Sequence, residues 1–249
     1  MRAHLPTPLH GWRAFLGEVG IVVLGVLIAL AAGQLVETLH RGEQARLAER
    51  AMRLELGGDD GPQAYGRVAI GACLDRQIAL IHDGAAAAPA DQLRRWTASY
   101  SPPFRTWDNE AWKVVTSSDV GDYMGAERLI DWSAAYRALP LLNDLNLRET
   151  QLAGELHDVL PPQGEPSPTD RQNLRRLAGQ LQMSNNRLTR GSELFLARIR
   201  PLGASVSGPM QQTLLRTARA IYGNCVITPD HTGPAAAQSP TANVRGFFR

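Results

Sequence analysis

The sequence is short of the residues and motifs from which most catalytic and metal sites are built. It has six histidines and only two cysteines, Cys73 and Cys225, among 249 residues. The cysteines are too far apart for a zinc site of the Cys-x-x-Cys type. A phosphate-binding loop, a dinucleotide-binding fingerprint and a His-Glu-x-x-His motif are also absent. We therefore expect no catalytic motif, no cofactor and no bound metal.

Lysine is almost absent, and the charge is close to balance. Arginine supplies all but one of the 26 basic residues, the exception being Lys113, and the net charge is +2. No face or tail concentrates this charge, so nucleic acid is not expected as a partner. The abundance of Arg, Ala, Gly and Pro is typical of a GC-rich gene, and single arginines therefore carry little functional information.

Signals for β-structure are missing as well. No segment combines alternating apolar and polar residues with a hairpin turn, and the one β-leaning run, residues 225–228, is too short. We predict an all-α fold: an N-terminal transmembrane helix extended by a juxtamembrane helix, followed by an irregular helical bundle.

One long apolar run is present, from residue 19 to residue 36, between Glu18 and Glu37. As a helix, these uncharged residues would be about 27 Å long, close to the roughly 30 Å thickness of a bilayer's hydrocarbon core. A helix in a soluble core would keep a polar stripe. A signal peptide cleaved near residues 29–31 is the stronger alternative, but the apolar run continues past that point. The sequence favours an uncleaved anchor in a lipid bilayer.

Small residues follow one face of this predicted span. Gly25, Ala29 and Gly33 are four residues apart, a spacing that lets two membrane helices approach closely. Because Gly and Ala are common in any span, the face could equally meet lipid. A homodimer through the transmembrane helix is one expectation.

The charges beside the span give opposing indications of its orientation. Two arginines precede the span and four follow it within twenty residues, which by the positive-inside rule places the body in the cytoplasm. Acidic residues at helical spacing, such as Glu37 before Arg41, pair with the arginines that follow. We expect a periplasmic body, with a cytoplasm-facing adaptor as the alternative. In the periplasm, Cys73 and Cys225 would form a disulfide rather than stay free thiols.

Several short motifs resemble an uncharacterised family of bacterial single-span membrane proteins. A fainter likeness runs from Trp107 to Tyr136. The resemblance implies an uncleaved anchor in the bacterial inner membrane and a helical domain of unknown function, and it implies no activity. The motifs are Gly17-Glu18, Gly25-Val26-Leu27-Ile28-Ala29-Leu30, Arg53-Leu54-Glu55-Leu56 and Cys73-Leu74-Asp75-Arg76.

The chain is expected to divide into five parts. The Gly- and Asp-rich stretch 57–62 departs from a continuous helix, which leaves open whether the helix after the span breaks there. The Pro- and Gly-rich composition after residue 227 predicts disorder. The parts are an N-terminal tail (1–18), the transmembrane helix (19–36), a juxtamembrane helix (37–56), a helical domain (57–227) and a disordered tail (228–249).

Apolar periodicity predicts the helices of the domain. Early helices are expected near residues 63–81 and 91–99, and a last one over 210–222. Pro140 is expected to kink or break another helix. The clearest helix opens at Ser167, which is followed by Pro168 and Asp170 as a capping signal. Its apolar seam recurs every seven residues, at Leu174, Leu181, Leu188 and Phe195.

Residues 96–136 hold four of the five tryptophans and three of the five tyrosines. An aromatic-lined ligand pocket is one interpretation. A core built from bulky rings is the favoured one, because four large side chains fall on one helical stripe. They are Leu129, Trp132, Tyr136 and Leu139.

Two His-Asp pairs, His82-Asp83 and His157-Asp158, invite comparison with all-helical metal phosphohydrolases. Both pairs lie at predicted helix ends, where a cationic histidine interacts favourably with the helix dipole. His231 falls in the tail, so a metal site would be hard to complete. We expect a scaffold, assembly or sensing module that acts through an unknown protein partner. The alternative is a membrane-tethered enzyme with a dispersed site at His82, His157 and residues 96–136.

Overall fold

The computed structural model describes residues 12–229, and every regular element in that range is a helix. The all-α prediction is therefore confirmed. Residues 1–11 of the predicted N-terminal tail (1–18) and residues 230–249 of the predicted disordered tail (228–249) lie outside the described residues. The elements are α1 (Trp12–Leu54), the π-helical turn η1 (Glu55–Asp60), α2 (Gly61–Gly84), α3 (Ala90–Ser99), α4 (Glu110–Ser117), η2 (Asp119–Tyr123), α5 (Ala126–Tyr136), α6 (Ala138–Asp158), α7 (Pro168–Ile199), η3 (Arg200–Leu202), α8 (Gly208–Tyr222) and η4 (Gly223–Cys225).

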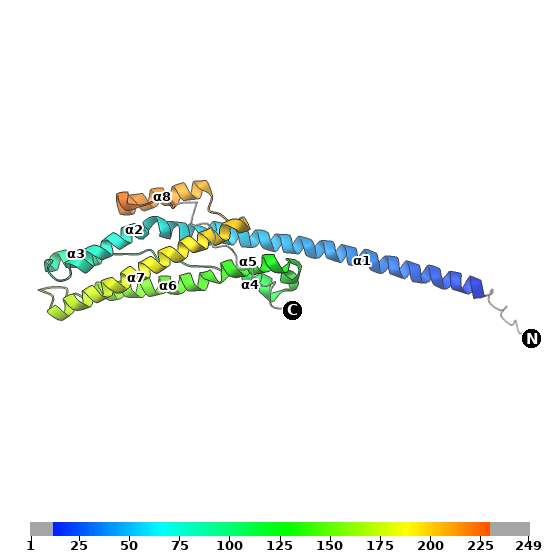
Figure 1. Cartoon of the computed structure of the whole chain (residues 1–249), viewed down its shortest axis with the longest axis horizontal. Coiled ribbons are helices and arrows are strands. Elements are labelled where there is room, and N and C mark those ends of the chain that lie inside the picture. Colours follow the sequence, from blue (N-terminus) through cyan, green and yellow to red (C-terminus); the bar gives the residue numbers. More distant parts are fainter. Residues whose placement is uncertain (1–11, 230–249) are drawn as a thin grey trace, which may run out of the picture.

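α1 protrudes from the body as a single long helix (Figure 1). The protruding part contains the predicted span, and its apolar side chains are exposed all round, with Ile21, Leu24 and Ile28 each more than half accessible. It is the one helix within residues 12–229 that is long and apolar enough to cross a membrane. Its length and its apolar side chains on every face would fit the hydrocarbon core of a bilayer.

The helix does not end at Leu56. It continues through η1 into α2, so that residues 12–84 form one unbroken rod that enters the body. In η1 the Gly61 N–H donates to the Leu56 carbonyl, an i→i+5 bond that keeps the backbone paired through the turn. The stretch 57–62 is therefore a wide helical turn rather than a break.

Two glycines of this turn let another segment pass close to the backbone. A Cβ on Gly57 would lie 3.1 Å from both the backbone N and O of Ser205. A Cβ on Gly61 would lie 2.7 Å from the Leu56 carbonyl oxygen and 3.1 Å from a methyl of Val206. Glycine at both positions allows the π-turn and the chain crossing it to share this space.

The body is a layered bundle around α2 and α7. α7 packs against α2 on one side and α6 on the other, and α8 covers a further face of α2 (Figure 1). The predicted heptad seam of α7 is confirmed, since Leu174, Leu181, Leu188 and Phe195 are all fully buried. The predicted capping box is also present, with Asp170 N–H donating to Ser167 Oγ.

The apolar interior falls into two clusters along α7. A distal cluster joins α2, α3, α6, α7 and α8 and includes Leu74 and Leu181. A junction cluster joins the end of α1 to α4, α5, the start of α6 and the end of α7, and includes Met52 and Phe195. The aromatic stripe belongs to the junction cluster: Trp132 and Tyr136 are buried, and Leu129 packs against them. The core interpretation of these residues is confirmed.

The helix break expected at Pro140 is present, three residues before the proline. The chain turns at Arg137, between α5 and α6, and Pro140 sits in the first turn of α6. A first-turn residue has no intrahelical N–H bond to lose, so the proline starts this helix without distorting it.

Cys73 and Cys225 are joined by a disulfide, with sulfur atoms 2.13 Å and Cα atoms 5.2 Å apart. It ties α2 to η4, across 152 residues of sequence. Nearby, the Ile227 N–H donates to the Ala69 carbonyl, which holds the end of the described chain along α2.

Alanine substitutions at Gly58 in η1 and at Gly61 directly after it test how this turn is built. Gly61→Ala forces a Cβ against the Leu56 carbonyl, and we expect it to lower the free energy of unfolding by about 1–3 kcal/mol. Gly58→Ala is the matched control, because its Cβ would meet nothing within 4 Å, and it should be neutral or stabilising by up to about 1 kcal/mol. Urea unfolding of the full chain in detergent, followed by circular dichroism, measures both. Equal free energies of unfolding for Gly61→Ala and Gly58→Ala would contradict the described turn.

Candidate functional site at the junction of anchor and body

The body meets α1 only a few residues past the predicted span. The guanidinium of Arg41 lies 4.8 Å from the ring centroid of Tyr123, in η2. Arg41 is five residues beyond Val36, or about 7.5 Å along the helix axis. This rise is comparable to the thickness of the headgroup layer on one side of a bilayer. If the span is in a membrane, η2 lies next to its surface.

A buried glutamate fastens this part of the body to α1. Glu49 is 6% exposed; it accepts a hydrogen bond from Arg53, at 2.7 Å, and forms an ion pair with Arg128 of α5, at 3.0 Å. Arg53 in turn donates to the Leu202 carbonyl at 2.9 Å. Glu49 thereby joins α1 to α5, and its partner Arg53 joins α1 to η3.

Two acidic side chains of η1 hold the start of α4. Asp60 Oδ1 accepts a hydrogen bond from the Asp108 N–H at 3.1 Å, and Glu55 Oε2 accepts one from the Ala111 N–H at 2.9 Å. The amides at the start of a helix have no intrahelical partner and carry partial positive charge, so carboxylates are suitable partners for them.

Asp60 is unusual among these acids because it is 1% exposed. Its Oδ2 atom has no hydrogen-bond partner within the described part of the chain. Burial is the largest cause that raises the pKa of Asp60 to about 7, and the hydrogen bond from the Asp108 N–H partly offsets it. The charge of Glu55 raises it further. Burial, and then the neighbouring Glu55 carboxylate, likewise raise the pKa of Tyr136 above its ordinary value.

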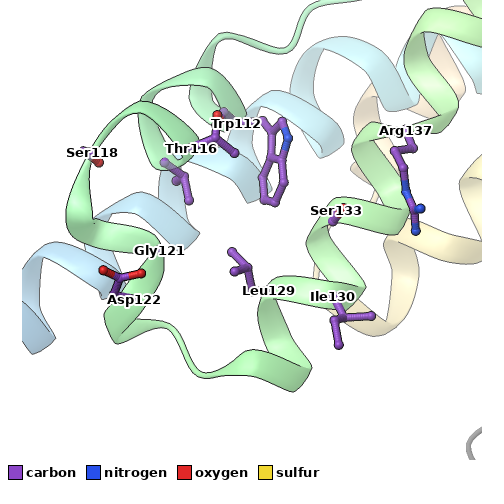
Figure 2. A pocket seen from close by; sticks show the side chains of 10 residues that line it. Trp112, Thr116, Ser118, Gly121, Asp122, Leu129, Ile130, Ser133 and Arg137 are labelled. Carbon is purple, nitrogen blue, oxygen red and sulfur yellow. The ribbon is translucent and has the colours of Figure 1, made fainter.

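Beside this contact lies a cavity of about 500 Å³ between α4, η2 and α5 (Figure 2). Trp112, whose indole stacks on the Tyr136 ring at 5.3 Å, stands on one side of it, facing Leu129. The lining residues are Trp112, Val115, Thr116, Ser118, Gly121, Asp122, Leu129, Ile130, Ser133 and Arg137.

The lining gives the cavity a mixed chemical character. Val115 and Leu129 give the cavity apolar walls. Asp122 and Arg137 place one charge of each sign at its edge (Figure 2). Such a cavity suits a small amphipathic molecule or an apolar side chain of a partner protein. The sequence located this region through its tryptophans but did not distinguish the buried rings from Trp112, which lines the cavity.

The two His-Asp pairs do not form a metal centre. His82 Nδ1 lies 3.0 Å from Asp83 Oδ1, and His157 Nε2 donates to the Tyr100 carbonyl at 2.9 Å. Within residues 12–229, no group of three or more His, Cys, Asp or Glu side chains could hold a metal ion. His231 lies outside the described residues.

Gly25, Ala29 and Gly33 are exposed on α1, far from the body. A Cβ at either glycine would meet nothing within 4 Å in the single chain. Their face contacts no other part of residues 12–229, and a second helix or lipid could cover it.

The sequence analysis missed a buried polar layer between the two apolar clusters. Arg67 is fully buried and forms a bidentate ion pair with Glu149, at 2.6 and 2.7 Å. It also donates to the Asn185 side-chain carbonyl at 2.6 Å. The Arg67 donors meet the negative charge of Glu149 and the side-chain amide of Asn185. This layer therefore fixes the registry of α2, α6 and α7 and is poorly suited to a catalytic role.

A signal for this layer was present in the sequence. Arg67 is the one charged residue between Asp60 and Asp75, in an otherwise apolar or small stretch. Glu149 lies seven residues from both Leu142 and Leu156, on the buried stripe of α6. The arginine-rich composition led us to discount the first of these signals.

Comparisons with protein-family models, with curated proteins and with solved structures give no match for this chain.

Proposed function

We propose that the chain is a single-pass protein of the bacterial inner membrane whose helical body, in the periplasm, acts through contacts as a sensing or assembly module. The observation that carries this proposal is the unbroken helix of residues 12–84. It begins as an exposed apolar rod and ends as the central helix of the body. A rod of this kind couples packing in the body to the anchor without a flexible linker.

The cavity between α4, η2 and α5 is the proposed contact site. η2 and α4 both pack against α1, and α5 is joined to it through Arg128 and Glu49. An occupant that moved these elements would therefore act on the anchor helix directly. A protein partner that inserts an apolar side chain is the favoured occupant, because the cavity is open at its edge and lined by exposed Ile130.

Two further features support the proposal. Disulfides persist in oxidising compartments and are rare in the cytoplasm, so the Cys73–Cys225 bond favours a periplasmic body. The resemblance of the N-terminal motifs to single-span bacterial membrane proteins agrees with it. The exposed face of Gly25, Ala29 and Gly33 would let two anchors pair in the bilayer.

Topology reporters fused to the C-terminus test the compartment. We expect alkaline phosphatase to be active there and a cytoplasm-dependent fluorescent protein to stay dark, because the proposal exports the body. Mass spectrometry of the same cells should find the Cys73–Cys225 peptide pair linked. The reverse reporter pattern, with free thiols, would favour the cytoplasm-facing adaptor.

Photocrosslinking in cells tests the contact site. A photoreactive residue at Ile130, on the cavity edge, should yield one defined adduct, whereas the same residue at Ile221 on α8 should yield none. Both side chains are about equally exposed, at 63% and 69%, so exposure alone predicts equal yields. Ser133→Trp, which fills the cavity, should reduce the Ile130 adduct at least tenfold. If the yield of the Ile130 adduct were the same in Ser133→Trp as in the wild type, the cavity would not be the contact site.

A further inference from the structure

The π-turn places two carboxylates side by side. In an α-helix, residues five apart project about 140° apart. The wider i→i+5 winding of η1 turns Glu55 and Asp60 toward the same neighbour, the start of α4. Single turns of this kind inside α-helices are frequent at functional positions.

Few polar bonds join η1 to the start of α4, although residues 105 and 106 before it are held separately by hydrogen bonds to Gln63 and Asn146. The polar part of this contact consists of the Asp108 and Ala111 amides, one on each carboxylate. The other oxygen of Asp60 is buried without a partner among the described residues. A negative charge on Asp60 therefore has one hydrogen bond in place of the several that water would supply, whereas a proton removes the charge altogether.

The groups that face Asp60 offer no compensation for its charge. From its own turn they are Glu55 and Asp59, and from the segment before α4 the nearest is Asp108. α5 contributes the Tyr136 hydroxyl, and the crossing segment 204–206 has no titratable side chain. All the charged members of this set are acidic.

We propose that Asp60 is a proton-binding switch: in its protonated form it keeps α4 docked on the π-turn, and loss of the proton loosens this contact. The switch acts at the place where the anchor helix enters the body, and α4 carries Trp112 and Val115 of the cavity with it. The proposal does not depend on the function proposed above, since it concerns a contact within one chain.

The direction and range of the pH dependence follow from the pKa of Asp60. In the docked form this pKa is raised to about 7, and in a loosened, hydrated form it returns toward the ordinary value near 4. Between these values the docked form holds the extra proton, so acid favours docking. The equilibrium constant for loosening should rise by about tenfold per pH unit over this range and level off above pH 7.

Hydrogen exchange of the full-length protein in detergent, from pH 5 to pH 8, tests the proposal. Peptides covering residues 105–117 report on the docked segment, after correction for the intrinsic pH dependence of amide exchange. We expect their protection to fall by up to about tenfold per pH unit between pH 5 and 7 and to level off above. Peptides of α7 should show no such trend.

Three variants give the proposal its controls. Asp60→Asn carries no charge, so its protection should stay at the acid level throughout. Asp59→Asn, at an exposed acid of the same turn, removes a charge that raises the pKa of Asp60 less than Glu55 does, so it should keep the wild-type slope and move the levelling-off point less than Glu55→Gln does. Glu55→Gln removes a neighbouring charge and should move the levelling-off point to lower pH, which provides a test even if Asp60→Asn does not fold. The proposal would be overturned if protection of residues 105–117 in the wild-type protein did not change with pH. It would also be overturned if protection in Asp60→Asn fell with pH as steeply as in the wild type.

Discussion

The structure depends on one constraint: the backbone of residues 12–84 stays helical from the exposed apolar segment to the middle of the body. A helix that runs from an exposed segment into a protein core has to accommodate the crossing of other segments without losing its hydrogen bonds. The turn η1 does so by widening to i→i+5 pairing and by having glycine where Ser205 and Val206 approach. The segment 204–206, the start of α4 and the cavity beside it are all placed by this turn.

The body contains two buried electrostatic arrangements of opposite character. In the layer between the apolar clusters, Arg67 and Glu149 neutralise each other and their hydrogen bonds are largely satisfied. Such a pair contributes more to a unique arrangement of helices than to net stability. At the π-turn, Glu55 and Asp60 have only backbone amides for partners, and burial raises the pKa of Asp60 to about 7. The first arrangement fixes the bundle, whereas the second can respond to its surroundings.

Much of the helical framework could be predicted from local pattern. The capping signal at Ser167 and the seam through Leu188 depend on neighbours in sequence, and both were correctly placed. The turn at residues 57–62 could not be predicted in the same way, because Gly57 and Gly61 are approached by a segment nearly 150 residues away. The pair Glu55 and Asp60 was missed because these two residues would not share a face in α-helical geometry. The break expected at Pro140 is present at Arg137, because a local rule for proline needs no distant neighbour.

The continuity of the helix through η1 is the central claim, and a distance across the turn tests it most directly. Spin labels on non-natural side chains at Glu43 and Arg76, both exposed, leave the two cysteines intact. In the full-length protein in bilayer discs, pulsed electron spin resonance should give a single narrow distribution near 50 Å, the length of about 33 residues of helix. A shorter and broad distribution, typical of a flexible break at Gly57 and Gly58, would contradict the account.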